Sequence, residues 1–157
     1  MITTILVEHP WLAPALLVAV VAAGLLAGSW LVARRRVAWW LAAASLVPVV
    51  ALTLVPVDRE LFARCSVQWA LPTPGRVELM ANLALFVAPV LLVGVATRRP
   101  LLALLAGSGA SVLVEAVQAA VPAIGRSCDT NDWLSNTLGA ALGAGLAWVA
   151  LRRAQRV

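Results

Sequence analysis

Residues 11–36 read WLAPALLVAVVAAGLLAGSWLVARRR, an apolar run without any charged residue from Trp11 to Ala33 that ends in three arginines. A helix that crosses the ~30 Å hydrocarbon core of a bilayer needs about 20 apolar residues. The run has this length, and its basic residues follow it instead of preceding it. It therefore predicts a membrane-spanning helix and not a cleaved signal peptide.

The composition of the whole chain supports this interpretation. Of its 157 residues, 62% are hydrophobic and 12% are charged, whereas globular proteins average about 25% charged residues. A soluble fold of this size has too much surface to bury so many apolar side chains. The formal net charge is +5, but no basic face with interleaved aromatic residues accompanies it, so we expect no nucleic-acid partner.

Four further apolar runs of similar length follow the first one. They cover residues 37–57, 77–96, 101–121 and 133–151. Together with residues 11–33 they predict an all-α fold: a polytopic transmembrane bundle of five helices. We expect residues 1–157 to form a single transmembrane domain.

The charged residues divide unevenly between the two sides of these spans. One side carries eight arginines and no acid: Arg34, Arg35, Arg36, Arg98, Arg99, Arg152, Arg153 and Arg156. The other side mixes arginines with acids. The positive-inside rule then predicts that the N-terminus lies outside and the C-terminus in the cytoplasm, in the cytoplasmic membrane of a bacterium.

Two pairs of glycines predict close helix packing. Gly24 and Gly28 lie four residues apart in the first span, and Gly139 and Gly143 do so in the fifth. Small residues at this spacing let helix backbones approach closely in lipid. We interpret both pairs as packing contacts within the chain.

The two cysteines lie in two different connectors on the predicted outer side. Cys65 follows the second span and Cys128 follows the fourth. That compartment permits disulfides, so we predict a Cys65–Cys128 bond, worth about 4 kcal/mol in the chain-entropy model. The alternative is two unpaired thiols. The chain has no CxxC motif, and we expect no metal and no cofactor.

Polar residues gather near the outer ends of the last three spans. A carboxylate such as Glu115, within the fourth span, is expensive in lipid and should face the bundle interior. Gln118 lies on the same helical face, nearer the surface. We predict one polar pocket, lined by Asn82, Glu115, Gln118, Arg126, Asp129, Asp132 and Asn136.

Most of these residues also have a purely structural explanation. Asp132, or Asn131 beside it, is well placed to cap the fifth helix. The two other asparagines would hydrogen-bond between helices, and Arg126 would pair with Asp129 at the surface. Glu115 is the hardest to explain in this way, and it is the candidate for a catalytic role.

Residues 115–143 read EAVQAAVPAIGRSCDTNDWLSNTLGAALG. A Glu-x-x-Gln at a helix end is followed by Arg-x-x-Asp-x-x-Asp, then by Asn-Thr-x-Gly with another glycine four residues on. This order and spacing resemble the signature of VanZ-like membrane proteins, over about residues 77–150. The matching positions are Glu115, Gln118, Arg126, Asp129, Asp132, Asn136, Gly139 and Gly143.

An earlier motif of the family is matched only in part. The family has an asparagine, a phenylalanine four residues later and then Pro-x-Gly. Here NLALFVAPVLLVG supplies Asn82 and Phe86, but Pro89 is displaced by one position and the following glycine is missing. We therefore expect the kink of the third helix to differ from that of the family.

The resemblance implies a function in the cell envelope, because the family is linked to low-level resistance to the glycopeptide teicoplanin. We expect an outward-facing pocket that recognises a lipid-linked cell-envelope molecule or a lipoglycopeptide, with Arg126 meeting an anionic headgroup. The alternatives are an enzyme that modifies such a lipid, with Glu115 as general acid or base beside Asp129 and Asp132, and a non-catalytic packing or partner-binding protein. Membrane lipids are expected partners in every case.

Overall fold

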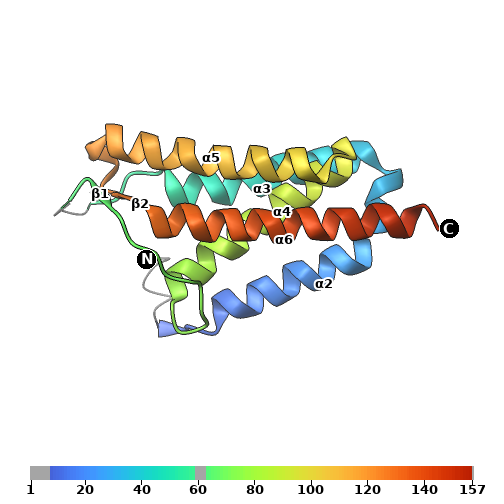
Figure 1. Cartoon of the computed structure of the whole chain (residues 1–157), viewed down its shortest axis with the longest axis horizontal. Helices are drawn as coiled ribbons and strands as arrows, with labels where there is room; N and C mark the ends of the chain where they lie inside the picture. The colour runs from blue at the N-terminus through green and yellow to red at the C-terminus, as the bar shows by residue number, and fades with distance from the viewer. Residues whose placement is uncertain (1–7, 59–62, 157) are drawn as a thin grey trace.

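The computed structural model describes residues 8–58 and 63–156 and shows five long helices running along one axis (Figure 1). All five are long and apolar enough to cross a membrane, which confirms the predicted all-α bundle. The helices are α2 (Leu12–Ala33), α3 (Arg35–Thr53), α4 (Val77–Thr97), α5 (Pro100–Ala120) and α6 (Thr130–Ala154). Two short strands, β1 (Cys65–Ser66) and β2 (Cys128–Asp129), and the 3₁₀ turn η1 (Pro122–Ile124) lie in the connectors at one end.

The bounds of α3 and α6 differ most from the apolar runs. α3 ends at Thr53, four residues before the end of its apolar run. Pro56 disfavours helix in the residue before it, and the backbone N–H of Val57 donates to the carbonyl oxygen of Ile124, in the η1 turn, at 3.0 Å. Hydropathy alone does not predict that α3 ends at Thr53, because the residues that follow Thr53 are still apolar.

α6 begins three residues before its apolar run, and the predicted cap at Asp132 or Asn131 is wrong. Asp129 is the N-cap: its backbone is extended, and its Oδ1 accepts the N–H of Asn131 at 2.8 Å. The first turn of α6 is polar and projects beyond the apolar part of the helix. The capping residue of α6, Asp129, therefore lies earlier in the sequence than the start of the apolar run suggests.

α4 and α6 form the centre of the bundle, and α2, α3 and α5 pack around them. Val87 and Val95 of α4 and Ala140 and Ala147 of α6 are almost wholly buried. Gly139 lets the two central helices touch, because a Cβ at this position would collide with the carbonyl oxygen of Leu83 in α4.

The other predicted glycine contacts are also within the chain. A Cβ on Gly143 would strike the carbonyl oxygen of Val87 in α4. A Cβ on Gly24 would come within 2.8 Å of a Leu91 methyl group, and one on Gly28 within 2.8 Å of the Ala150 methyl group. Both glycine pairs thus bring helices of one chain together, as predicted.

The outer faces of α2, α3 and α5 are strongly apolar. Leu26 of α2 is 83% exposed, Trp40 of α3 is 78% exposed and Leu105 of α5 is 59% exposed. Apolar surface of this extent is not stable against water. Lipid is the solvent that these faces require, so the chain is a multi-pass membrane protein.

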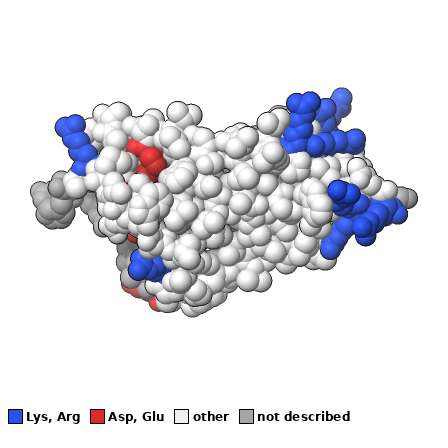
Figure 2. Space-filling view, in the orientation of Figure 1, with Lys and Arg blue, Asp and Glu red and all other residues white. Residues whose placement is uncertain are grey.

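The two ends of the bundle differ in charge and in connector length. The arginine end comprises the α2–α3 connector, the α4–α5 connector and the end of α6, and every charged side chain visible there in Figure 2 is basic. The disulfide end comprises the connectors of residues 54–76 and 121–129, and Figure 2 shows both signs of charge there. Which end faces the cytoplasm stays a prediction.

Candidate functional site

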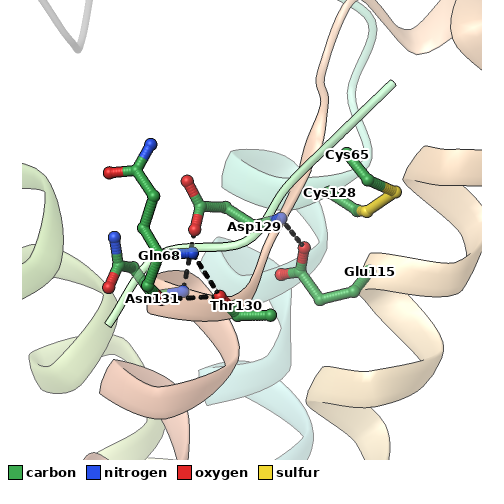
Figure 3. Close-up of a disulfide and its surroundings, with 7 residues drawn as sticks. All are labelled: Cys65, Gln68, Glu115, Cys128, Asp129, Thr130 and Asn131. Atoms are coloured by element: carbon green, nitrogen blue, oxygen red, sulfur yellow. Dashed lines mark hydrogen bonds between the residues drawn. A yellow bond between two sulfur atoms is a disulfide. The ribbon is translucent and has the colours of Figure 1, made fainter. Parts of the chain in front are cut away.

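A disulfide ties together the two connectors of the disulfide end. Cys65 and Cys128 are bonded, with their Cα atoms 4.5 Å apart and a sequence separation of 63, so the predicted bond is present. Around it β1 pairs in parallel with β2, and the N–H of Cys128 donates to the carbonyl oxygen of Arg64 at 3.0 Å. We call the disulfide together with the paired strands β1 and β2 the junction, and Figure 3 shows it next to the ends of α5 and α6.

Three hydrogen bonds continue the junction onto α6. The backbone N–H of Gln68 donates to Oγ1 of Thr130 at 2.8 Å, and the Thr130 hydroxyl donates to the Gln68 carbonyl oxygen at 2.6 Å. The N–H of Ala70 donates to Oδ1 of Asn131 at 2.7 Å. The connector between α3 and α4 is thereby fastened to the first turn of α6.

Glu115 joins α5 to the same junction. Its Oε2 accepts the backbone N–H of Asp129 at 2.7 Å (Figure 3). The carboxylate of Asp129 is itself occupied in capping α6. Glu115 is half-buried, and its bond to a backbone N–H near the start of a helix suits an anion.

Asp132 lies within a cluster of acidic groups. The carboxylates of Glu78, Glu115 and Asp129 are close enough to repel its charge, and the Asn82 side chain lies against its carboxyl group. Four residues of the predicted pocket are therefore brought together. Glu78 was not predicted to belong with them, although it precedes Asn82 by one helical turn on the same face of α4.

Gln118 and Asn136 lie deeper, each bound to a different helix. Nε2 of Gln118 donates to the carbonyl oxygen of Thr53 at the end of α3, at 2.9 Å. Nδ2 of Asn136 donates to Oγ of Ser111 in α5, also at 2.9 Å. Both side chains are buried, and the amide oxygen of each has no hydrogen-bond partner.

A polar seam between α5 and α6, formed by Ser108, Ser111, Asn136 and Thr137, continues towards the middle of the bundle. The hydroxyls of Ser108 and Thr137 are 2.9 Å apart and hydrogen-bonded. Sequence reasoning singled out only Asn136 from this seam. The available signal was the spacing of Ser108, Ser111 and Glu115, which places all three on one face of α5.

Several buried polar atoms near this end have no hydrogen-bond partner. All belong to residues 118–136: Gln118 Oε1, Arg126 Nε, Trp133 Nε1, Ser135 Oγ and Asn136 Oδ1. Buried polar atoms in proteins are nearly always paired. The group includes both donors and acceptors.

The seven predicted residues thus divide into three sets. Asn82, Glu115, Asp129 and Asp132 meet at the surface of the junction, Gln118 and Asn136 link helices below it, and Arg126 is half-buried with its Nε unpaired. A shallow depression on the outer side of α3 and a cavity of about 240 Å³ at the arginine end lie elsewhere. A pocket bounded by all seven residues stays a prediction.

The chain was compared with known proteins in three ways. The family model described as VanZ/LLP1 matches residues 12–151, which include all five helices up to the last turn of α6. No curated protein and no solved structure matches the chain.

Proposed function

The chain belongs to the VanZ/LLP1 family, and from this premise we propose that it is a recognition protein of the bacterial cytoplasmic membrane. Its disulfide end faces outward and binds the polar headgroup of an amphiphile. The ligand class is a lipid-linked cell-envelope intermediate or a lipoglycopeptide such as teicoplanin. The arginine end, which carries no acid in its connectors, then lies on the cytoplasmic side.

The observation that carries the proposal is the group of unpaired buried polar atoms below the disulfide. The amide oxygens of Gln118 and Asn136 are acceptors, and Arg126 Nε and Trp133 Nε1 are donors. A headgroup with sugar hydroxyls, amides and a phosphate offers partners for both kinds. Leaving such groups unpaired in a buried site costs about 1–3 kcal/mol each, so a ligand that pairs them gains affinity.

The location of the group also favours an amphiphile. The unpaired atoms belong to the last turn of α5, the α5–α6 connector and the first turns of α6, at the same end of the bundle as the disulfide. A ligand with an acyl tail places its headgroup at this level when the tail lies in the bilayer. Lipid anchoring thus delivers the headgroup to the site.

The test is the susceptibility of bacteria that express the wild type or Glu115→Gln, at matched membrane levels. Glutamine keeps an acceptor oxygen for the N–H of Asp129, so the variant removes charge while it preserves the fold. We expect the wild type to raise the inhibitory concentration of teicoplanin but not of vancomycin, which lacks a lipid tail, and Glu115→Gln to abolish the increase.

The control variant is Asp58→Asn, which removes one charge from an exposed side chain at the same end. It should behave as the wild type does. If expression of the wild type changes the inhibitory concentration of neither drug, the lipoglycopeptide is not the ligand. If a folded Glu115→Gln retains the teicoplanin shift, the cluster has only a structural role.

Catalysis on the same lipid is the second candidate, and the crowding of carboxylates around Asp132 favours it. A pair of neighbouring carboxyl groups can act as general acid and general base, as in glycoside hydrolysis. The purified protein is incubated with lipid-linked precursors, with and without Mg²⁺, beside Glu115→Gln. Product that forms with the wild type alone supports an enzyme, and no product from any precursor argues for recognition.

A further inference from the structure

The arginine end contains a cavity that the proposed function does not use. It has a volume of about 240 Å³ and lies where α2, α3 and α4 meet. Its lining residues are Val32, Arg35, Val95, Ala96, Thr97 and Arg98. The valines and the alanine belong to the apolar core or pack against it, and the two arginines are exposed. The cavity therefore has a largely polar, cationic lining with a smaller apolar part next to the core.

The two rim arginines differ from others at the same end. The guanidinium of Arg34 lies 4.0 Å from the ring centre of Trp30, and Arg153 donates a hydrogen bond to a backbone carbonyl of α2 at 2.9 Å. Among the residues that the structure describes, Arg35 and Arg98 have no such contact. Their charges are available to a group that enters the cavity.

The start of α3 adds backbone donors at the same rim. α3 begins at Arg35, its N-cap residue makes no side-chain hydrogen bond, and its first turn contains no acid. The first N–H groups of a helix have no partner within the helix and carry the positive end of its dipole. Helix starts of this kind bind phosphate readily.

We propose that this cavity binds the phosphate group of an anionic phospholipid. Arg35 and Arg98 contact the phosphate oxygens, and the glycerol and acyl chains lie against the apolar outer surfaces of α2 and α3. Basic sites between helix ends at a membrane surface select anionic headgroups. Exposed tryptophans of α3, Trp39 and Trp40, lie one turn further along at the level typical of lipid headgroups.

A lipid fits this position better than a free anion does. The cavity opens at the end of an apolar bundle, beside the exposed apolar faces of α2 and α3. A lipid headgroup is held at that depth by its own acyl chains. This inference is independent of the function proposed for the disulfide end.

The test is native mass spectrometry of the purified protein in a neutral detergent with added phosphatidylglycerol, phosphatidylcholine or inorganic phosphate. We expect one phosphatidylglycerol to stay bound to the wild type, whereas phosphatidylcholine and inorganic phosphate dissociate. The double variant Arg35→Gln/Arg98→Gln should bind phosphatidylglycerol about tenfold more weakly or worse, because two charge-assisted hydrogen bonds are lost.

The matched control is Arg36→Gln/Arg156→Gln, which removes the same charge from exposed side chains at the same end but leaves the cavity intact. It should retain the lipid. Equal losses in both double variants would mean general attraction to basic surface and would overturn the proposal. If the wild type retains inorganic phosphate as strongly as phosphatidylglycerol, the cavity binds a free anion, and the proposal of a lipid site is overturned.

Thermal unfolding in detergent gives a second, independent measurement. A ligand that binds only the folded state raises the unfolding temperature. Phosphatidylglycerol should raise it for the wild type and for the control variant but not for Arg35→Gln/Arg98→Gln. Without lipid all three should unfold at the same temperature, because the substituted side chains are exposed. A lipid-induced rise that is equal in all three proteins would refute the site.

Discussion

The disulfide end and the arginine end are built in opposite ways. At the arginine end a single residue, Arg34, separates α2 from α3, and Arg98 and Arg99 separate α4 from α5. At the disulfide end the connectors span residues 54–76 and 121–129 and are joined by a disulfide, a pair of strands and several hydrogen bonds. Short connectors form most of the arginine end, where Arg153 adds one long-range hydrogen bond to α2, whereas many contacts between distant residues form the disulfide end.

This difference predicts where substitutions matter. Side chains at the disulfide end are bound to partners that lose their own hydrogen bond when the side chain is removed. Exposed arginines at the other end leave no buried partner behind. Stability should therefore be sensitive to substitutions at the disulfide end and the helix contacts below it, and insensitive at the arginine end.

The largest effect is expected from Gly139→Val, below the disulfide end. The new side chain would collide with the Leu83 carbonyl oxygen of α4, and a backbone atom cannot move aside. We expect a loss of more than about 4 kcal/mol, seen as little or no monodisperse protein after purification in detergent. Gly145→Val is the control, because nothing lies within 4 Å of its Cβ position. Equal yields of the two variants would contradict the packing of α6 on α4.

The next largest effect is expected from Cys65→Ser/Cys128→Ser. The disulfide closes a loop with a sequence separation of 63, and the chain-entropy model assigns about 4 kcal/mol to a loop of this length. Denaturant unfolding in detergent measures the loss. The wild type treated with a reducing agent should match the double variant, while the reducing agent should not affect the variant. An unchanged unfolding midpoint in the reduced wild type would refute this role.

A smaller effect is expected from Gln118→Leu. The substitution removes the donor that binds the Thr53 carbonyl oxygen at the end of α3 and should destabilise the protein by about 1–3 kcal/mol. Ser45→Ala is the control, since the Ser45 hydroxyl bonds only within its own helix and its loss should change stability by less than about 0.5 kcal/mol. Thermal unfolding of both variants in one detergent gives the comparison, and equal losses would count against the α3–α5 link.

The smallest effect is expected from Arg36→Gln/Arg99→Gln at the arginine end. Both side chains are exposed, and such substitutions usually change stability by less than about 0.5 kcal/mol each. The same thermal assay checks this. A destabilisation as large as that of Gln118→Leu would show that Arg36 or Arg99 makes a stabilising tertiary contact and would contradict this prediction.

Much of the fold was predictable because insertion of a helix into a membrane depends on its local hydropathy. Each apolar run is long enough to cross the bilayer independently of the others, so five helices follow from five runs. The ends of α3 and α6 were less predictable, because Pro56 and the cap formed by Asp129 act through backbone geometry. Neither effect changes the hydropathy of the residues concerned.

The candidate site was predictable in part for a similar reason. Ionisable residues in an apolar helix, such as Glu115, stand out in sequence. The hydroxyls of Ser111 and Thr137 do not, since small polar residues are common in membrane helices. The partner of Gln118 is the backbone carbonyl of Thr53, and every residue has such a carbonyl, so no sequence signal identifies it.

The sequence by itself determined the five spans, the segregation of arginines to one end and the oxidisable cysteine pair, because each depends on local composition and on the order of spans along the chain. Only the tertiary structure decided that Glu115 binds the N–H of Asp129, that Gln118 reaches α3 and that Arg35 and Arg98 share a cavity. Those contacts depend on how far each helix is rotated and how closely it packs. The close approach of α6 to α4 at Gly139 is one such packing contact, and it exists only in the assembled bundle.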